Sequence, residues 1–287
     1  MFAVFALATS LLWGLADFGG GLLARRAPAL SVVVASQALA TAVLGALVLA
    51  TGGWSEAGPR LWFAVAAGFL GPTAILSFYR ALAIGPMGLV SPLVALGSVV
   101  VPVAVGLALG ERLGPAQAAG SAVAVAGVVL AGGSRLGGAP VHRRTLLLSL
   151  TAALSFGTVI ALVAEAATTL TGLFLALFTQ RLCNVAVGGA ALWAAARRGG
   201  AVLPARGARL VRALPALAFV GLADVAANGT YNLAARHGPV TVAAVLASLY
   251  PVVTAFAARG VLGERLHAVQ AAGAGLALAG SVLLAAG

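Results

Sequence analysis

The chain has 287 residues, of which 62% are hydrophobic and only 8% charged, and its net charge is +11. A soluble domain carries roughly 25% charged residues, so this composition cannot cover a water-facing surface and excludes a soluble fold. The 17 basic residues are all arginines that fall mostly between apolar runs, without the interleaved aromatic residues of a nucleic-acid-binding patch. We therefore expect an integral membrane protein with no nucleic-acid partner, whose arginines set its orientation in the bilayer.

Long apolar runs bounded by Gly, Pro and Arg predict about ten transmembrane helices. Each run approaches the roughly 20 residues that cross the hydrocarbon core as a helix, and the alternating pattern of a membrane barrel is absent. The first run lacks a positive leading region and is expected to be a retained helix rather than a signal peptide. In chain order, the helices are expected near 2–23, 30–51, 61–82, 87–109, 114–133, 145–164, 170–195, 213–235, 240–262 and 266–286.

The first five predicted helices recur as the last five. Residues 109–120 (LGERLGPAQAAG) match residues 262–273 (LGERLHAVQAAG) at nine of twelve positions, with an offset of 153. Further upstream, an offset of 143 pairs Trp13-Gly14 with Phe156-Gly157, because a longer arginine-rich loop follows the seventh helix. The expected division is a first repeat over 1–133, a basic connector over 134–144 and a second repeat over 145–287.

Loop charges predict how the two repeats lie in the membrane. The loop after the first helix holds Arg25 and Arg26, whereas its counterpart after the sixth holds only Glu165. The loop after the second helix is nearly neutral, whereas its counterpart after the seventh is rich in arginine. An odd number of helices per repeat and this opposite bias predict two inverted five-helix repeats in the cell (inner or plasma) membrane. The arginine-rich loops are expected in the cytoplasm and both termini outside.

Each half resembles an EamA domain of the drug/metabolite transporter superfamily. The features behind the resemblance are Trp13-Gly14, the turns Gly85-Pro86 and Gly238-Pro239, and the Gly-Glu-Arg-Leu motif at 110–113 and 263–266. The resemblance implies a ten-helix exporter or permease of metabolites such as amino acids, nucleosides or drugs. It also implies a role for Arg181, which stands where the family often has an arginine. Family members usually have cytoplasmic termini, opposite to the orientation that the arginines indicate here.

Ionisable residues inside apolar spans are candidates for function because burying them in a bilayer is costly. Asp17 shares a helix face with Ser10, Gly14 and Gly21, and Asp224 shares one with Asn228 and Asn232. We predict that Asp17 and Asp224 couple transport to a proton or ion. Three alternatives remain open: Asp17 pairs with Arg25 or Arg26, Asp224 only joins helices by hydrogen bonds, and Arg181 only neutralises an aspartate.

Further candidates come from aromatic, amide and proline residues within the spans. The predicted solute-binding residues are Trp13, Gln37, Tyr79, Gln180, Arg181, Asn228, Tyr231, Asn232 and Tyr250. For the aromatic residues, packing or interfacial anchoring is the alternative. Prolines within predicted helices interrupt backbone hydrogen bonding and are the predicted hinges: Pro92, Pro102 and Pro251.

The sequence favours a secondary transporter that exports a small amphipathic metabolite, an amino acid or similar, by alternating access. A multidrug or cation-type efflux permease is the alternative, followed by a non-transporting membrane scaffold. An intramembrane aspartyl enzyme is suggested only by the recurrence of Gly-Leu-Ala-Asp at 14–17 and 221–224. These two aspartates are not at equivalent repeat positions, and no catalytic motif accompanies them. We expect no enzymatic activity, cofactor or metal, the solute and the lipid bilayer as partners, and a monomer, with a homodimer as the alternative.

Overall fold

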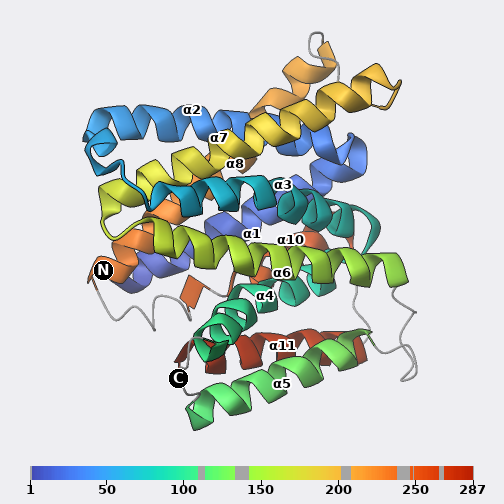
Figure 1. Cartoon of the computed structure of the whole chain (residues 1–287). Coiled ribbons are helices and arrows are strands. Elements are labelled where there is room, and N and C mark those ends of the chain that lie inside the picture. The colour runs from blue at the N-terminus through green and yellow to red at the C-terminus, as the bar shows by residue number, and fades with distance from the viewer. Residues whose placement is uncertain are drawn as a thin grey trace.

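The computed structural model describes residues 2–108, 114–132, 142–201, 208–237, 246–247, 249–264 and 268–286. Within these residues the chain is helical and contains no strand, which confirms the all-α class (Figure 1). The elements are α1 (Phe2–Arg26), α2 (Ala29–Thr51), the short 3-10 helix η1 (Gly53–Glu56), α3 (Leu61–Ile84), α4 (Met87–Ala108), α5 (Pro115–Gly132), α6 (Arg143–Ala166), α7 (Leu170–Arg197), α8 (Ala208–His237), α10 (Tyr250–Leu262) and α11 (Ala268–Ala286).

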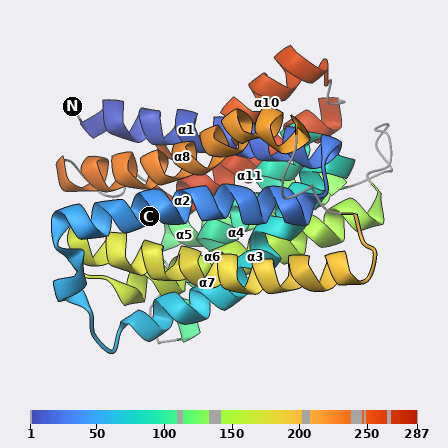
Figure 2. The same ribbon diagram turned by 90° about the horizontal axis from the view of Figure 1, so that it is seen from above.

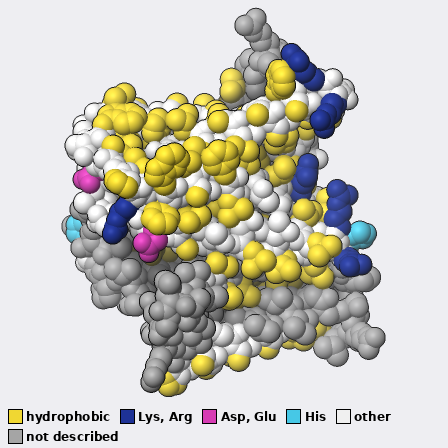
Figure 3. Space-filling view, in the orientation of Figure 1, with side chains coloured by type: hydrophobic (Ala, Val, Ile, Leu, Met, Phe, Trp, Pro, Cys, Tyr) yellow, Lys and Arg dark blue, Asp and Glu magenta, His cyan; other side chains and the backbone are white. Residues whose placement is uncertain are grey.

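Six of the described helices are long and apolar enough to cross a bilayer, namely α1, α2, α3, α6, α7 and α8. Shorter apolar stretches lie in α4, α10 and α11. Hydrophobic side chains also lie across the face drawn in Figure 3, between the two ends of the molecule. Trp62, Phe69 and Phe256, for example, are 74%, 62% and 70% exposed. Such a belt is unfavourable in water and suits the hydrocarbon of a lipid bilayer.

Helices of the first half pack mainly against helices of the second half, as Figures 1 and 2 show. The pairs are α1 with α8, α2 with α7, α3 with α6, and α5 with α11. Their contacts run in opposite chain directions: Thr9 of α1 bonds Thr230 of α8, whereas Gly19, ten residues later in α1, lies against Val220. The two halves therefore interlock rather than form separate bundles.

Glycines bring two helix pairs, α4 with α6 and α5 with α11, into backbone contact. A Cβ added to Gly157 of α6 would overlap the carbonyl of Gly97 in α4, and one added to Gly97 would overlap the backbone of Ala153. Gly127 of α5 lies equally close to the backbone of α11 at Ala277. Small residues at these crossings allow the close van der Waals packing that holds helices together in lipid.

Nearly all described arginine side chains gather at one end of the molecule, at the right edge of Figure 3. This arginine-rich end contains the last turns of α1, α3, α7 and α10 and the first turns of α4, α6 and α8. Its arginines are Arg25, Arg26, Arg80, Arg143, Arg144, Arg197, Arg198, Arg212 and Arg259. The opposite end, where both described termini lie (Figure 1), holds Glu56, Arg60, Glu165 and the last turn of α8.

Several helix boundaries differ from those that the sequence predicts. α8 begins at Ala208 rather than near 213, so Arg209 and Arg212 lie in a helix rather than in a loop. α10 begins at Tyr250, which puts Pro251 in its first turn and not in the interior of a helix running over 240–262. Proline is tolerated in a first turn because the backbone N–H it lacks would have no partner there. Residues 240–245 and 248 of that predicted helix and most of the predicted connector lie outside the described residues.

Candidate functional site

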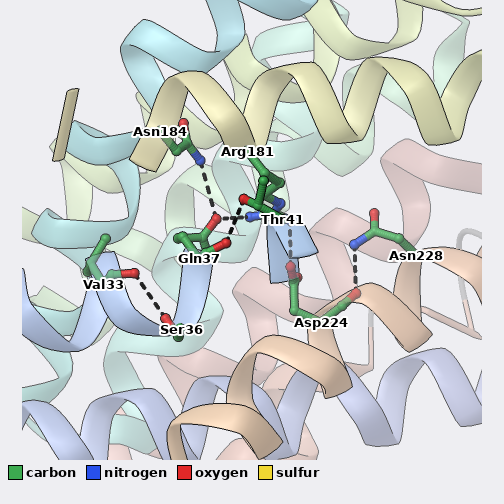
Figure 4. Close-up of polar contacts among 8 residues, drawn as sticks. All are labelled: Val33, Ser36, Gln37, Thr41, Arg181, Asn184, Asp224 and Asn228. Atoms are coloured by element: carbon green, nitrogen blue, oxygen red, sulfur yellow. Dashed lines mark hydrogen bonds and ion pairs between the residues drawn. The ribbon is translucent and has the colours of Figure 1, made fainter. Parts of the chain in front are cut away.

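A buried polar cluster joins α2, α7 and α8 within the bundle (Figure 4). Arg181 of α7 donates from Nη1 to Oε1 of Gln37 at 2.6 Å and from Nη2 to Oδ2 of Asp224 at 2.5 Å. Asn184, one turn further along α7, donates from Nδ2 to the same Gln37 oxygen at 3.3 Å. We call these four residues the arginine cluster. Arg181 is only 9% exposed, and its charge is tolerated here because a carboxylate and an amide oxygen accept its hydrogen bonds.

Glycines in α3 make room for this cluster. A Cβ on Gly71 would overlap the side-chain amide of Asn184, and one on Gly68 would overlap Cβ of Cys183. α3 therefore packs directly on the polar face of α7. The close packing leaves Gln37 and Asn184 only 4% and 2% exposed, which shields the ion pair from water and strengthens its electrostatic attraction.

Three buried polar atoms on this face of α7 have no hydrogen-bond partner among the described residues. They are Oε1 of Gln180, Nε of Arg181 and Oδ1 of Asn184. Buried polar atoms are nearly always paired, with protein or with ordered water. One free donor and two free acceptors within a single helical turn therefore give this face capacity for a polar ligand or for water.

Asp17 of α1 lies beside the cluster without belonging to it. It is close enough to Asp224 for the two like charges to repel each other. No hydrogen bond or ion pair of its carboxylate is found within the described part of the chain. Arg25, the partner suggested by one alternative, is bonded instead to Glu264. One turn further along α1, Gly20 lies directly against the buried hydroxyl end of Tyr79, which brings α3 to the same face of α1.

Aromatic residues from three helices adjoin Asp17 on the other side. The ring centroid of Trp13 is 6.0 Å from that of Tyr231 in α8 and 6.0 Å from that of Tyr250 in α10. All three residues are half-buried, and we call them the aromatic box. Trp13 and Asp17 are four residues apart on α1 and therefore share one helix face. The carboxylate of Asp17 and the aromatic box therefore lie side by side.

The amide stripe of α8 is less available than its spacing suggests. Nδ2 of Asn228 donates to the backbone carbonyl of Asp224, and Nδ2 of Asn232 to that of Asn228, each at 2.8 Å. Each amide group therefore donates one hydrogen bond within its own helix, and mainly its oxygen is left to accept a hydrogen bond from a solute. Asn184, which bonds Gln37, was not among the predicted binding residues; its spacing of three from Arg181 and four from Gln180 is the signal that pointed to it.

The predicted hinge prolines lie apart from the arginine cluster. Pro92 and Pro102 belong to α4, where Pro92 is buried. Pro251 follows Tyr250 of the aromatic box at the start of α10. There α10 crosses α1 closely: Oγ1 of Thr254 donates to the carbonyl of Gly14 at 3.1 Å. This contact fixes the start of α10, and with it Tyr250, against α1.

A polytopic helical bundle with a lipid-facing surface and a buried polar cluster defines the class of integral membrane proteins that handle polar solutes. The family model of the EamA-like transporter family matches residues 1–133 and again residues 143–286. The chain therefore belongs to this family, and it is a membrane transporter of the drug/metabolite transporter superfamily with two EamA repeats. The expectation of a transport protein rather than an enzyme agrees with this membership.

Comparison with solved structures supports the same fold. One match, titled "Crystal structure of protein", has a TM-score of 0.62 and 18% sequence identity, and it covers 98% of this chain and 95% of that chain. At this identity the likeness concerns the fold alone. A search of the curated proteins found no match.

Proposed function

We propose that this transporter carries a small amphipathic solute with an amino group, an amino acid or similar, in the export direction by alternating access. The observation that supports this most is Asp17. Its carboxylate has no partner among the described residues, although Asp224 beside it is paired with Arg181. A carboxylate within a membrane span is costly, and an ammonium group on the solute would neutralise it.

The surroundings of Asp17 fit the rest of such a solute. The aromatic box next to it offers ring faces that attract a cation and an apolar wall for a hydrophobic side chain. On the other side, Nε of Arg181 is buried and without a partner, so it is free to donate to a solute carboxylate. The proposed binding residues are those predicted from the sequence, with Asn184 added.

The same geometry separates the roles of the two aspartates. Asp224 is neutralised by Arg181 at 2.5 Å, so its charge is already balanced when no solute is bound. Asp17 has no such counter-charge within the described residues. We therefore propose Asp17, rather than Asp224, as the residue that takes up a proton or ion when the solute leaves.

We further propose that the repeats, with the predicted division at 1–133, 134–144 and 145–287, are inverted in the membrane. α1 and α3 both end at the arginine-rich end, where their sequence equivalents α6 and α8 begin. The clustering of arginines supports a cytoplasmic location for this end and an external location for both termini, in the cell (inner or plasma) membrane.

A cation-type efflux permease remains the second candidate, and charge supports it. In the middle of the described bundle, Asp17 and Asp224 provide two carboxylates against the single guanidinium of Arg181. The excess negative charge suits a solute that is cationic and lacks a carboxylate.

The test is counterflow of labelled solutes into liposomes that contain the purified protein. Zwitterionic amino acids, their deaminated acids and quaternary ammonium compounds are compared, with and without a pH gradient. Flux of amines with an apolar side chain, and none of the deaminated acids, is the expected result. Flux of quaternary cations alone favours the efflux alternative, and no flux of any solute by folded protein contradicts the proposal.

A further inference from the structure

A polar junction ties four helix ends together at the arginine-rich end. Arg25, in the last turn of α1, donates to the backbone carbonyl of Leu82 from Nε at 3.2 Å and from Nη2 at 3.1 Å. Its Nη2 also donates to the carbonyl of Gly85 at 3.0 Å and lies 2.6 Å from Oε1 of Glu264. The other carboxylate oxygen, Oε2 of Glu264, accepts the backbone N–H of Met87 at 2.8 Å. Glu264, just after α10, is thus bonded to the end of α1 and the start of α4, and Arg25 in turn is bonded to the end of α3.

The Gly-Glu pair of the repeated motif explains how Glu264 reaches this position. Gly263 ends α10 with a φ of +65°, a left-handed conformation that glycine adopts without strain. Its N–H bonds the carbonyl of Arg259 at 3.1 Å, and the chain then turns toward the start of α4. Met87 is the first residue of α4, so its N–H has no partner within the helix. A carboxylate placed there is favoured by both the hydrogen bond and the helix dipole.

An apolar layer lies directly beneath the junction. Leu82 and Met87 are fully buried and pack so closely on α1 that a Cβ on Gly21 would come within 2.9 Å of both. Phe18 and Ala258 belong to the same buried cluster. Along α1 this layer separates Arg25 from Asp17. Among the described residues, this layer therefore obstructs passage along α1 from the arginine-rich end to the candidate binding site.

Along the interface of α1 with α8, the side of Asp17 that faces the opposite end has fewer buried apolar residues among those described. The aromatic box there is half-buried. Beyond it, the described apolar cluster between α1 and α8 has only Ala6 and Ala234 as buried members. A hydrogen bond of 2.9 Å between Thr9 and Thr230 crosses the same interface. Among the described residues, an ion pair between helix ends thus occurs at the arginine-rich end only, whereas the opposite side of Arg181 carries an uncharged apolar cluster of α2, α7 and α8 that includes Leu44 and Leu177.

We propose that the junction of Arg25, Glu264 and the Met87 N–H is a gate that closes the arginine-rich end of the transport path. This inference rests on the proposed transport function and names the device that controls access to its site. Glu264 comes from the second repeat, whereas its partners come from the first. Opening separates the end of α10 from α1 and α4 by breaking the ion pair and the helix cap together, while Arg25 keeps its bonds to the α3 carbonyls. The structure represents the state in which this end is closed.

The test measures access to a cysteine beneath the gate. Ala258, which is fully buried below the junction, is changed to Cys in a Cys183→Ala background, and the purified protein in lipid nanodiscs reacts with a bulky hydrophilic maleimide. In the parent protein, labelling should be slow. Glu264→Gln should raise the labelling rate at least about fivefold, because it removes the ion pair and weakens the cap. Arg25→Gln should raise it as well.

Two matched variants control for the loss of charge. Arg26→Gln removes the charge next to Arg25 from a residue outside the junction, and Glu56→Gln removes a carboxylate that bonds Thr171 at the opposite end. Both should label at the parent rate. A parent rate for Glu264→Gln, or an equal rise in Arg26→Gln, overturns the gate. If Glu264→Gln does not give a monodisperse protein, Arg25→Gln decides by the same criterion. Labelling needs no solute, so failure of the gate is distinguished from failure of the transport proposal.

Discussion

Replacing Asp224 by asparagine nearly preserves the volume of the side chain but removes the carboxylate that neutralises Arg181. Nη2 of Arg181 lies 2.5 Å from this carboxylate, and the guanidinium retains only the neutral oxygen of Gln37 on Nη1. The variant therefore leaves a charge without a counter-charge inside the bundle. We therefore expect Asp224→Asn to destabilise the protein mainly because it leaves the guanidinium of Arg181 buried without a counter-charge.

The expected loss in the free energy of unfolding follows from the burial of Arg181 and Asp224. Removing one member of a buried ion pair costs about 3–5 kcal/mol. The side chain of Arg181 is 10% exposed and that of Asp224 is 23% exposed, so we expect the lower end, about 3 kcal/mol. Asp17→Asn is the matched control. It makes the same chemical change nearby at a carboxylate with no partner among the described residues, so its free energy of unfolding should fall by less than about 0.5 kcal/mol.

The assay is reversible unfolding of purified protein in mixed micelles, followed by the loss of helical circular dichroism. The double variant Arg181→Gln with Asp224→Asn removes both charges and should recover at least about 1.5 kcal/mol relative to the sum of the two single variants. Strict additivity of the two changes would show that Arg181 and Asp224 do not stabilise each other, and so would equal effects of Asp224→Asn and Asp17→Asn.

Three further outcomes follow from the packing of the site. Trp13→Ala should raise the KM for an amine solute about tenfold with little change in the maximal rate, since it removes one face of the aromatic box; an unchanged KM would exclude Trp13 from binding. Gly71→Val should lower the free energy of unfolding by about 1–3 kcal/mol because its side chain meets Asn184, whereas the same change at the open Gly189 should cost less than about 1 kcal/mol. Gly97→Val should prevent a folded protein from accumulating in membranes because α4 touches the backbone of α6 there; normal yield would contradict this.

The sequence predicts the helices and the repeat well because both depend on local or exact patterns. Apolar runs of sufficient length must be helical in lipid, and the repeated motif is legible without a structure. Helix ends are harder to predict: the break before Tyr250 and the start of α8 at Ala208 depend on tertiary contacts. Within a continuous apolar run, no residue pattern indicates where such a break occurs.

The contacts of the site could be predicted only in part. Ionisable residues in apolar spans identify Asp17, Arg181 and Asp224 as candidates, but not which of the two aspartates pairs with the arginine. That choice is made by α2, which packs against both α7 and α8 and so brings Arg181 to Asp224, a residue 43 positions away in the chain. The junction of Arg25 with Glu264 is also hidden in the sequence, because both residues resemble ordinary loop charges.

We propose that Asp17 binds the amino group of the transported solute. The most direct measurement is counterflow of a labelled amino acid with an apolar side chain into liposomes that contain the native protein or Asp17→Asn. We expect the native protein to exchange the amino acid but not its deaminated analogue, and Asp17→Asn to lose this exchange while remaining folded. Undiminished exchange by Asp17→Asn, or equal exchange of the deaminated analogue by the native protein, would contradict the claim.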